Sequence, residues 1–338
     1  MPTAPTRPRR PVVLVAAGLA AALMLTACGG EDAGSAAAAT RPGTVTIGAL
    51  SNGAATEVAL PVSQVDSIRA TLPAAVRDRG RLVIGLGLLP SGAPPLGYVG
   101  SDQKTLTGSE PDLGRLVAAV LGLRPVVTNA TWENMFVGFD SQKTDVGFSN
   151  ITVTEERKKK YDFACYREDN LGFEVLKSSA WNFGGRFENL AGRTVAVASG
   201  TNQEKILLQW QARLEAQGKT LKVSYFPDQN AVNLALAAGK IDTYFGPNPS
   251  VAYHVTQSAA TPNPTRSAGT FSGAGATLQG LICATTRKGS GLARPVADAI
   301  NHLIRTGQYA RWLAAWNLSD EAVRTAQVNP PGLPADNS

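Results

Sequence analysis

The feature that most constrains this chain is the alternation, between residues 81 and 316, of short apolar runs with longer stretches of helical periodicity. The runs at 81–89 and 194–198 are mostly apolar, as in parallel strands that are covered on both faces. The stretch at 113–121 places its leucines and valines three and four residues apart, which is the spacing of an amphipathic helix. Alternating strands and helices predict an α/β fold with a parallel sheet and a ligand site at the carboxyl ends of its strands.

The N-terminus has the pattern of a secretory signal. Three arginines within Arg7–Arg10 precede an apolar run, Pro11–Leu25, and small residues then lead to Cys28. The run is too short to span a membrane comfortably, which takes about 20 residues. The Leu-Thr-Ala-Cys ending resembles a lipobox, in which Cys28 is acylated, and an ordinary cleaved signal with an incidental Cys28 is the alternative. We expect residues 1–27 to be a lipoprotein signal peptide.

The stretch after Cys28 is poor in residues that could build a core. Gly29–Thr44 consists mostly of small residues, so we expect residues 28–65 to hold the lipidated cysteine and a flexible tether. This arrangement predicts a protein that is lipid-anchored on the extracytoplasmic face of the cell membrane. The net charge of +6 includes the three signal arginines, so the composition indicates no nucleic-acid partner.

A candidate anion-binding segment lies at residues 145–166. A strand-like run, Val146–Val153, ends among the hydroxyl side chains of Thr152 and Thr154, and Arg157 follows at the next turn. A guanidinium offers a planar fork of donors that matches a carboxylate. The alternative is that Arg157 heads a solvated basic run with the three lysines that follow it.

A second candidate is the small-residue turn Ser199-Gly200-Thr201, between the strand at 194–198 and a helix predicted over 202–217. Backbone N–H groups and a hydroxyl at a helix N-terminus can form a cradle for an anion. The alternative is simply a well-capped helix with a serine or threonine at its first position.

The 145–166 segment resembles the signature of the family 3 extracellular solute-binding proteins, the receptors of polar amino-acid ABC importers. Further family landmarks follow in the same order, including Trp132–Met135, Leu190–Glu204 and Lys240–Phe245. The resemblance implies a periplasmic-binding-protein-like (type II) fold, in which two α/β lobes are joined by a hinge of two crossing strands. The implied boundaries are 66–166 plus 275–323 for lobe one, 167–274 for lobe two, and 324–338 for a tail.

Carried over by position, the resemblance assigns ligand contacts to both lobes. Arg157 would hold a carboxylate of the ligand, with hydroxyl, backbone and amide contacts from Thr152 and Asn150 beside it. Thr201 and Asn202 would contribute from the other lobe.

The resemblance makes one further assignment, at Trp132, and the sequence departs from the family at the positions that bind the ligand's ammonium. Trp132 would form an aromatic wall, although core packing is the alternative for so large a ring. Receptors of this family present acidic residues to the ligand's ammonium, and the matching positions here are Gly87 and Pro247. A buried ammonium without a carboxylate partner costs several kcal/mol. Either Asn248 takes a weaker role or the ligand is a carboxylate-bearing solute that is not a zwitterionic amino acid.

Two cysteines remain besides Cys28. In an oxidising compartment Cys165 and Cys283 can pair as a disulfide, and two separate buried thiols are the alternative. The lobe boundaries implied by the resemblance place both cysteines beside the hinge, which favours the disulfide. His254 and His302 are the only histidines and are far apart, so we expect no metal site and no cofactor.

These observations predict a monomeric, lipid-anchored receptor that passes a small carboxylate-bearing solute, amino acid or derivative, to an ABC permease. No nucleophile is paired with a base in the sequence, which argues against an enzyme. Two alternatives stay open: a secreted enzyme on the same fold, such as a cyclic-acid dehydratase, and a ligand-sensing module that acts in trans.

Overall fold

A computed structural model describes residues 43–335 of the chain. The expected signal peptide and Cys28 lie outside this range. The strands are β1 (Thr44–Ile47), β2 (Val58–Pro61), β3 (Arg81–Leu86), β4 (Tyr98–Val99), β5 (Leu106–Thr107), β6 (Arg124–Asn129), β7 (Val146–Gly147), β8 (Tyr161–Leu176), β9 (Thr194–Val197), β10 (Lys222–Tyr225), β11 (Thr243–Pro247), β12 (Thr265–Ser272), β13 (Gly280–Arg287) and β14 (Ala322–Val328).

The helices alternate with these strands, as predicted. They are α1 (Asp66–Arg69), α2 (Ala74–Arg79), α3 (Ser109–Val120), α4 (Trp132–Asp140), α5 (Asn202–Glu215), α6 (Gln229–Ala237), α7 (Asn248–Ser258), α8 (Ala293–Arg305) and α9 (Gln308–Ala315), with short 3-10 turns η1 (Arg157–Lys159), η2 (Phe187–Leu190) and η3 (Ser319–Glu321). No helix among residues 43–335 is both long enough and apolar enough to cross a membrane.

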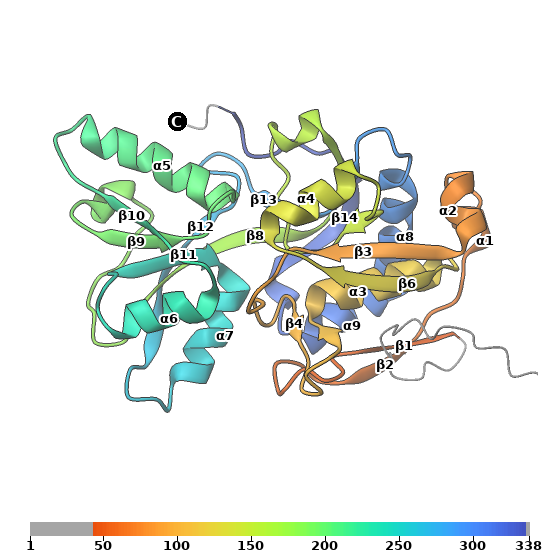
Figure 1. Cartoon of the computed structure of the whole chain (residues 1–338), viewed down its shortest axis with the longest axis horizontal. Helices are drawn as coiled ribbons and strands as arrows, with labels where there is room; N and C mark the ends of the chain where they lie inside the picture. Colours follow the sequence, from red (N-terminus) through yellow and green to blue (C-terminus); the bar gives the residue numbers. More distant parts are fainter. Residues whose placement is uncertain (1–42, 336–338) are drawn as a thin grey trace, which may run out of the picture. The chain divides into compact units, whose positions relative to one another are not determined.

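The 16-residue strand β8 is the element that both halves of the molecule share. Its first part, up to Asp169, pairs with β13. From Asn170 onward it pairs instead with β12, and from Leu171 also with β11. The main sheet has the order β10-β9-β11-β8-β13-β7-β3-β6, with β12 and β14 also paired to β8, and β8 passes from one half to the other in Figure 1. The change of partners places the crossing between the lobes at Asp169–Leu171.

Each half has its own apolar core. The larger core lies in lobe one, where α3 packs on β3 and β6, α8 packs on β8, β13 and β14, and α9 packs on α3 and α8. Lobe two is built around a stack of four buried aromatic rings: Phe173, Phe183, Trp210 and Phe245. The mixed α/β sheet and two separate cores agree with the expected two-lobe fold class.

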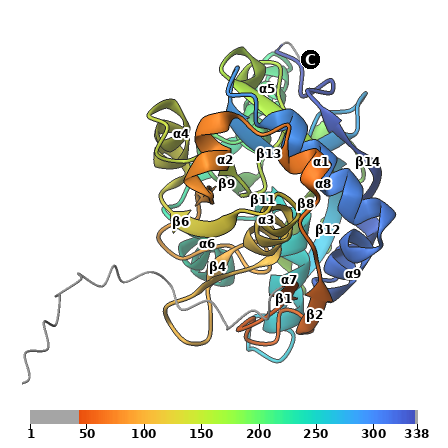
Figure 2. The ribbon, with the colours of Figure 1, turned by 90° about the vertical axis from the view of Figure 1, so that its right-hand side faces the viewer.

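Part of the expected tether is folded. Strands β1 and β2 form an antiparallel hairpin, and Val45, Ile47 and Leu60 lie in the lobe one core. The backbone N–H of Thr56 donates to the carbonyl of Ala315, which fixes the hairpin beside α9 (Figure 2). This hairpin was not predicted from the sequence, because its strands are only four residues long and are separated by mostly small or polar residues.

Two other expectations differ from the structure. The strand expected over 146–153 is limited to β7, and further along Asn150 has a left-handed backbone (φ 53) that a regular strand does not adopt. The tail expected from residue 324 begins inside β14, which pairs antiparallel with β8.

The remaining cysteines face each other on neighbouring strands. Cys165 on β8 is opposite Cys283 on β13, and the two form a disulfide. The bond closes a loop with a sequence separation of 118 residues. A loop of that length corresponds to a stabilisation of about 4–5 kcal/mol in the chain-entropy model.

Candidate functional site

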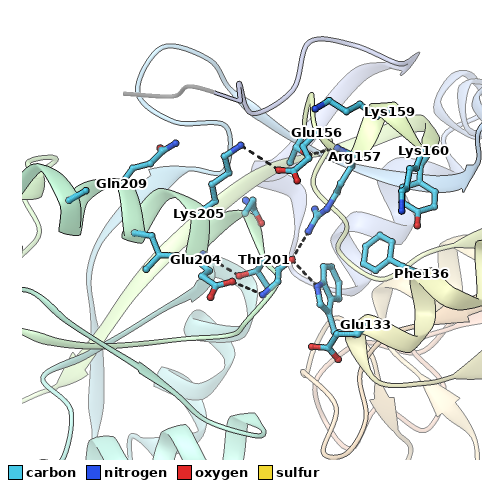
Figure 3. Close-up of a pocket in the computed structure, with 17 residues that line it drawn as sticks. Glu133, Phe136, Glu156, Arg157, Lys159, Lys160, Thr201, Glu204, Lys205 and Gln209 are labelled. Carbon is cyan, nitrogen blue, oxygen red and sulfur yellow. Dashed lines mark hydrogen bonds and ion pairs between the residues drawn. The ribbon is translucent and has the colours of Figure 1, made fainter.

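A cavity of about 970 Å³ lies between the two lobes. On the lobe one side it is bounded by α4 and η1, and on the lobe two side by the first turns of α5 (Figure 3). Its apolar lining comes from Trp132, Phe136, Tyr161, Leu208 and Ala212. Four of the seven residues predicted to bind ligand line this cavity: Trp132, Arg157, Thr201 and Asn202.

Arg157 crosses the space between the lobes. The hydroxyl of Thr154 accepts a hydrogen bond from the Arg157 backbone N–H, which begins η1 and aims the side chain inward. The guanidinium donates from Nη1 to the carbonyl of Thr152 (2.9 Å) and from Nη2 to the carbonyl of Gly200 (3.1 Å). It also lies 5.4 Å from the ring centre of Trp132 and 5.5 Å from that of Phe136.

These neighbours leave the charge of Arg157 without a counter-ion. Both hydrogen-bond acceptors are neutral carbonyls, and the guanidinium forms no ion pair with any residue in the part of the chain that the structure describes. Burial lowers the pKa of Arg157 to about 10, and the nearby charges of Asp169 and Glu156 oppose that shift. Arg157 therefore stays protonated at neutral pH and is suited to a carboxylate.

The turn before α5 is already capped by the chain itself. The Thr201 hydroxyl accepts a hydrogen bond from the backbone N–H of Glu204 (3.2 Å) and donates to the carbonyl of Ala198 (2.6 Å). The Glu204 carboxylate accepts from the N–H of Gly200 (2.6 Å), the residue just before the N-cap. The capped-helix interpretation thus describes this turn, and Glu204 occupies part of the expected anion cradle.

Trp132 stands at the start of α4, where the Thr131 side chain caps the helix. Its indole N–H donates to the carbonyl of Gly200 (3.1 Å), the same oxygen that Arg157 contacts. The ring packs edge-to-face on Phe136, with centroids 5.3 Å apart. Gly200 has φ 72, and a Cβ added there would lie 3.3 Å from the indole, so a glycine suits this close approach.

Thr152 and Asn202 meet at a carboxylate that the sequence did not single out. The hydroxyl of Thr152 donates to Oδ2 of Asp169 (2.7 Å), and the amide of Asn202 donates to the same oxygen (3.0 Å). Asp169 lies on β8 at the crossing and is only 1% exposed. Burial raises its pKa, while the bond from Thr152 and the charge of Arg167 oppose that rise. The available signal in the sequence was an acidic residue next to the expected boundary between the lobes at 166/167.

Asn150 and Asn248 contact other parts of the chain. The backbone N–H of Asn150 donates to Glu110 (2.8 Å), and its side-chain oxygen accepts from Arg167. Asn248 begins α7 and packs beside Gly172 on β8. Neither residue lines the cavity in this geometry.

Of the two positions where an ammonium-binding acid was expected, Gly87 is closely packed and Pro247 is half-buried. The N–H of Gly87 donates to the hydroxyl of Ser149 (2.9 Å), and a Cβ at Gly87 would lie 3.1 Å from Met135. Pro247 ends β11 opposite Leu171 on β8. Among residues 43–335 there is also no group of three histidine, cysteine or acidic side chains placed to hold a metal ion.

Curated relatives of this chain are binding proteins for amino acids. The L-cystine-binding protein TcyJ of Escherichia coli K12 is 32% identical over 168 residues, which is 49% of this chain and 59% of TcyJ. The chain therefore spans about three fifths of the length of that relative. The arginine-binding protein ArgT of Corynebacterium glutamicum is 27% identical over 272 residues, which is 80% of this chain and 84% of ArgT.

A solved structure of an ancestral arginine-binding protein bound to arginine matches this fold with a TM-score of 0.60 at 24% identity, over 70% of this chain and 98% of that one. At this identity the match shows the two-lobe fold alone. The family model for bacterial extracellular solute-binding proteins, family 3, matches residues 87–319, which is more than half of the chain. The chain therefore belongs to the family 3 bacterial extracellular solute-binding proteins.

Proposed function

We propose that this protein captures an amino acid, or a carboxylate-bearing derivative of one, in the cavity between its lobes and delivers it to an ABC permease. The relatives named for cystine and arginine binding support the ligand class. The observation that carries the proposal is Arg157, a protonated guanidinium in the cavity wall that contacts only neutral oxygens and aromatic faces. The ligand's carboxylate supplies the missing counter-charge.

Binding exchanges one acceptor of Arg157 for another. A carboxylate that accepts from Nη2 of Arg157 displaces the carbonyl of Gly200, which belongs to lobe two, while Nη1 keeps its bond to Thr152. A hydrogen bond to a charged partner contributes about 1.5–3 kcal/mol, against roughly 1 kcal/mol for a neutral pair. The exchange therefore favours the ligand and couples its entry to a movement of the turn at Gly200.

Asp169 is the acid that lies behind the Arg157 end of the site. Thr152 lies between the two charges, because its carbonyl accepts from Arg157 and its hydroxyl donates to Asp169. Asp169 is 1% exposed and does not line the cavity, and its Oδ2 already accepts from Thr152 and Asn202. It therefore fixes Thr152 and Asn202 in place, and the carboxylate of the ligand remains the end that the site favours.

The cellular setting of the proposal rests on the N-terminal sequence. A signal that ends in Leu-Thr-Ala-Cys supports a mature protein lipidated at Cys28 and held at the extracytoplasmic face of the membrane. It acts there as a monomer beside its permease.

Thermal-shift screening followed by calorimetry tests the ligand site. Cystine, arginine and glutamine are compared with agmatine, which keeps the guanidinium of arginine but lacks the carboxylate. We expect a carboxylate-bearing amino acid to raise the melting temperature by several degrees and agmatine to have little effect. Arg157→Ala should abolish the shift, and Arg157→Lys, which keeps the charge but not the planar fork, should restore only part of it. A ligand that stabilises Arg157→Ala as strongly as the wild type contradicts the proposal.

A further inference from the structure

The chain beyond β14 returns to the segment that carries Arg157. The match to the family model ends at residue 319, so this part lies outside it. Asn329, the first residue after β14, is held against β8. Its backbone N–H donates to the carbonyl of Phe163 (3.0 Å), and its side chain accepts from the N–H of Phe163 (2.8 Å). Figure 1 shows the C-terminal segment running from the β14 side of the molecule toward the α5 side.

Residues 330–333 bind the Arg157 turn along its length. The N–H of Leu333 donates to the carbonyl of Val153 (3.1 Å), and the N–H of Glu155 donates back to the carbonyl of Leu333 (3.0 Å). The N–H of Gly332 donates to Oε1 of Glu155 (2.9 Å). Lys158 donates to the same Glu155 oxygen (3.1 Å) and to the carbonyl of Pro330 (3.2 Å). Four of these contacts join residues 330–333 to the turn from which Arg157 projects, and the fifth, between Lys158 and Glu155, lies within the turn.

The side chain of Leu333 reaches the other lobe. It is fully buried, and it belongs to the apolar cluster of lobe two together with Leu171 and Phe173. Its backbone meanwhile pairs with Val153, whose side chain belongs to a lobe one cluster. A Cβ added to Gly332 would lie 2.5 Å from the Val153 carbonyl, so the segment fits only with a glycine beside Leu333. One residue thus contacts the core of lobe two and the ligand-binding turn of lobe one.

We propose that Pro330–Leu333 is a strap that positions the Arg157 turn and fastens it to lobe two. The strap makes the geometry of the carboxylate site depend on residues outside 87–319, the region that the family model matches. Its bearing on ligand affinity rests on the proposed function, whereas its positioning role does not. The strap residues hold the binding residue in place and do not themselves contact the cavity.

Hydrogen–deuterium exchange of the ligand-free protein tests the strap, so the outcome does not depend on which ligand binds. Leu333→Ala should speed exchange in Val153–Lys160 by roughly tenfold, while amides of β3, in the same lobe but away from the strap, change by less than about twofold. Leu333→Met should restore most of the protection, because it refills the apolar site. The matched control is Val328→Ala, on β14 and 38% exposed, which should leave both regions unchanged.

A second variant keeps the test decisive if Leu333→Ala folds poorly. Glu155→Gln retains the shape of the side chain but weakens the contacts to Gly332 and Lys158, so exchange should rise over the same residues by a smaller factor. Small-angle scattering of ligand-free Leu333→Ala should give a larger radius of gyration than the wild type, as the lobes separate. Exchange that rises equally in β3 and in the Arg157 turn, or an unchanged turn, overturns the positioning role.

Discussion

Arg157 and Arg167 lie close together in sequence but have opposite surroundings. Arg167 is 1% exposed and donates to two carboxylates of its own chain, Glu110 (3.0 Å) and Glu321. Tyr166 donates to the same Glu110, which completes a buried cluster in lobe one. Arg157 faces carbonyl oxygens, aromatic rings and the cavity.

The difference separates a structural arginine from one that is available to a ligand. Burial alone would lower the pKa of Arg167, but the facing carboxylates of Glu321 and Glu110 raise it above its usual value. For Arg157 burial prevails and the pKa falls to about 10, because no carboxylate is in contact. An arginine that lacks a counter-ion inside a cavity is a better candidate for ligand binding than one whose partners are already present.

The largest expected effect is on folding, from Arg167→Ala. The variant leaves Glu110 and Glu321 buried without their cation, which should lower the free energy of unfolding by about 3–5 kcal/mol. Urea denaturation measures this. The control is Arg79→Ala, which breaks a partly exposed pair with Asp145 and should cost about 1 kcal/mol or less. Equal losses in the two variants would remove the distinction between buried and exposed pairs.

Arg157→Ala should show the reverse pattern. Calorimetry with whichever amino acid binds the wild type should show affinity reduced by about 2–3 kcal/mol, roughly 30- to 150-fold. The free energy of unfolding should change by only about 1 kcal/mol, because the lost partners are two carbonyls. If unfolding is affected more strongly than binding, Arg157 is a structural residue like Arg167.

The third prediction concerns pH. Burial raises the pKa of Asp169 above that of the unfolded chain, so between those two values the folded state binds more protons. Stability then falls as pH rises through that window, and the loss persists above the folded pKa. Asp169→Asn cannot titrate, so its melting temperature relative to the wild type should improve from pH 4 to pH 7. A difference that is constant with pH would mean that Asp169 does not titrate differently on folding.

The smallest effect is expected from Trp132→Phe. Phenylalanine keeps an aromatic face toward Arg157 and Phe136 but loses the N–H that donates to Gly200. Ligand affinity should change by about 1 kcal/mol or less, which calorimetry resolves. A loss as large as that of Arg157→Ala would shift the main binding role from the guanidinium to the indole.

The alternation of strands and helices was readable from the sequence, but β8 was only partly so. The charged residues Arg167–Asp169 interrupt the apolar pattern in the middle of this strand. Two of them, Arg167 and Asp169, are buried, and their partners come from distant parts of the chain, such as Glu110 and Glu321 for Arg167. Sequence periodicity carries no information about such pairings.

The candidate site, like β8, was only partly predictable from the sequence. The motif around Arg157 identified a carboxylate-binding side chain, and that role stays a prediction. The motif could not show that Thr152 and Asn202 converge on Asp169, since the three residues come from separate elements. Nor could it show that Thr201 and Glu204 would cap their own helix, because the same residues serve equally well in a cap and in an anion cradle.

The β1–β2 hairpin sets a limit on how far the protein can stand from a membrane. If Cys28 carries the lipid, as we propose, the chain from Cys28 to Gly43 can extend no more than about 50 Å, at 3.3–3.6 Å per residue. A tether that ran to residue 65 would have reached about 120 Å. The hairpin also connects the tether to lobe one rather than to the hinge. Lobe one would then be the body held near the bilayer, and lobe two the part that swings when a ligand enters or leaves.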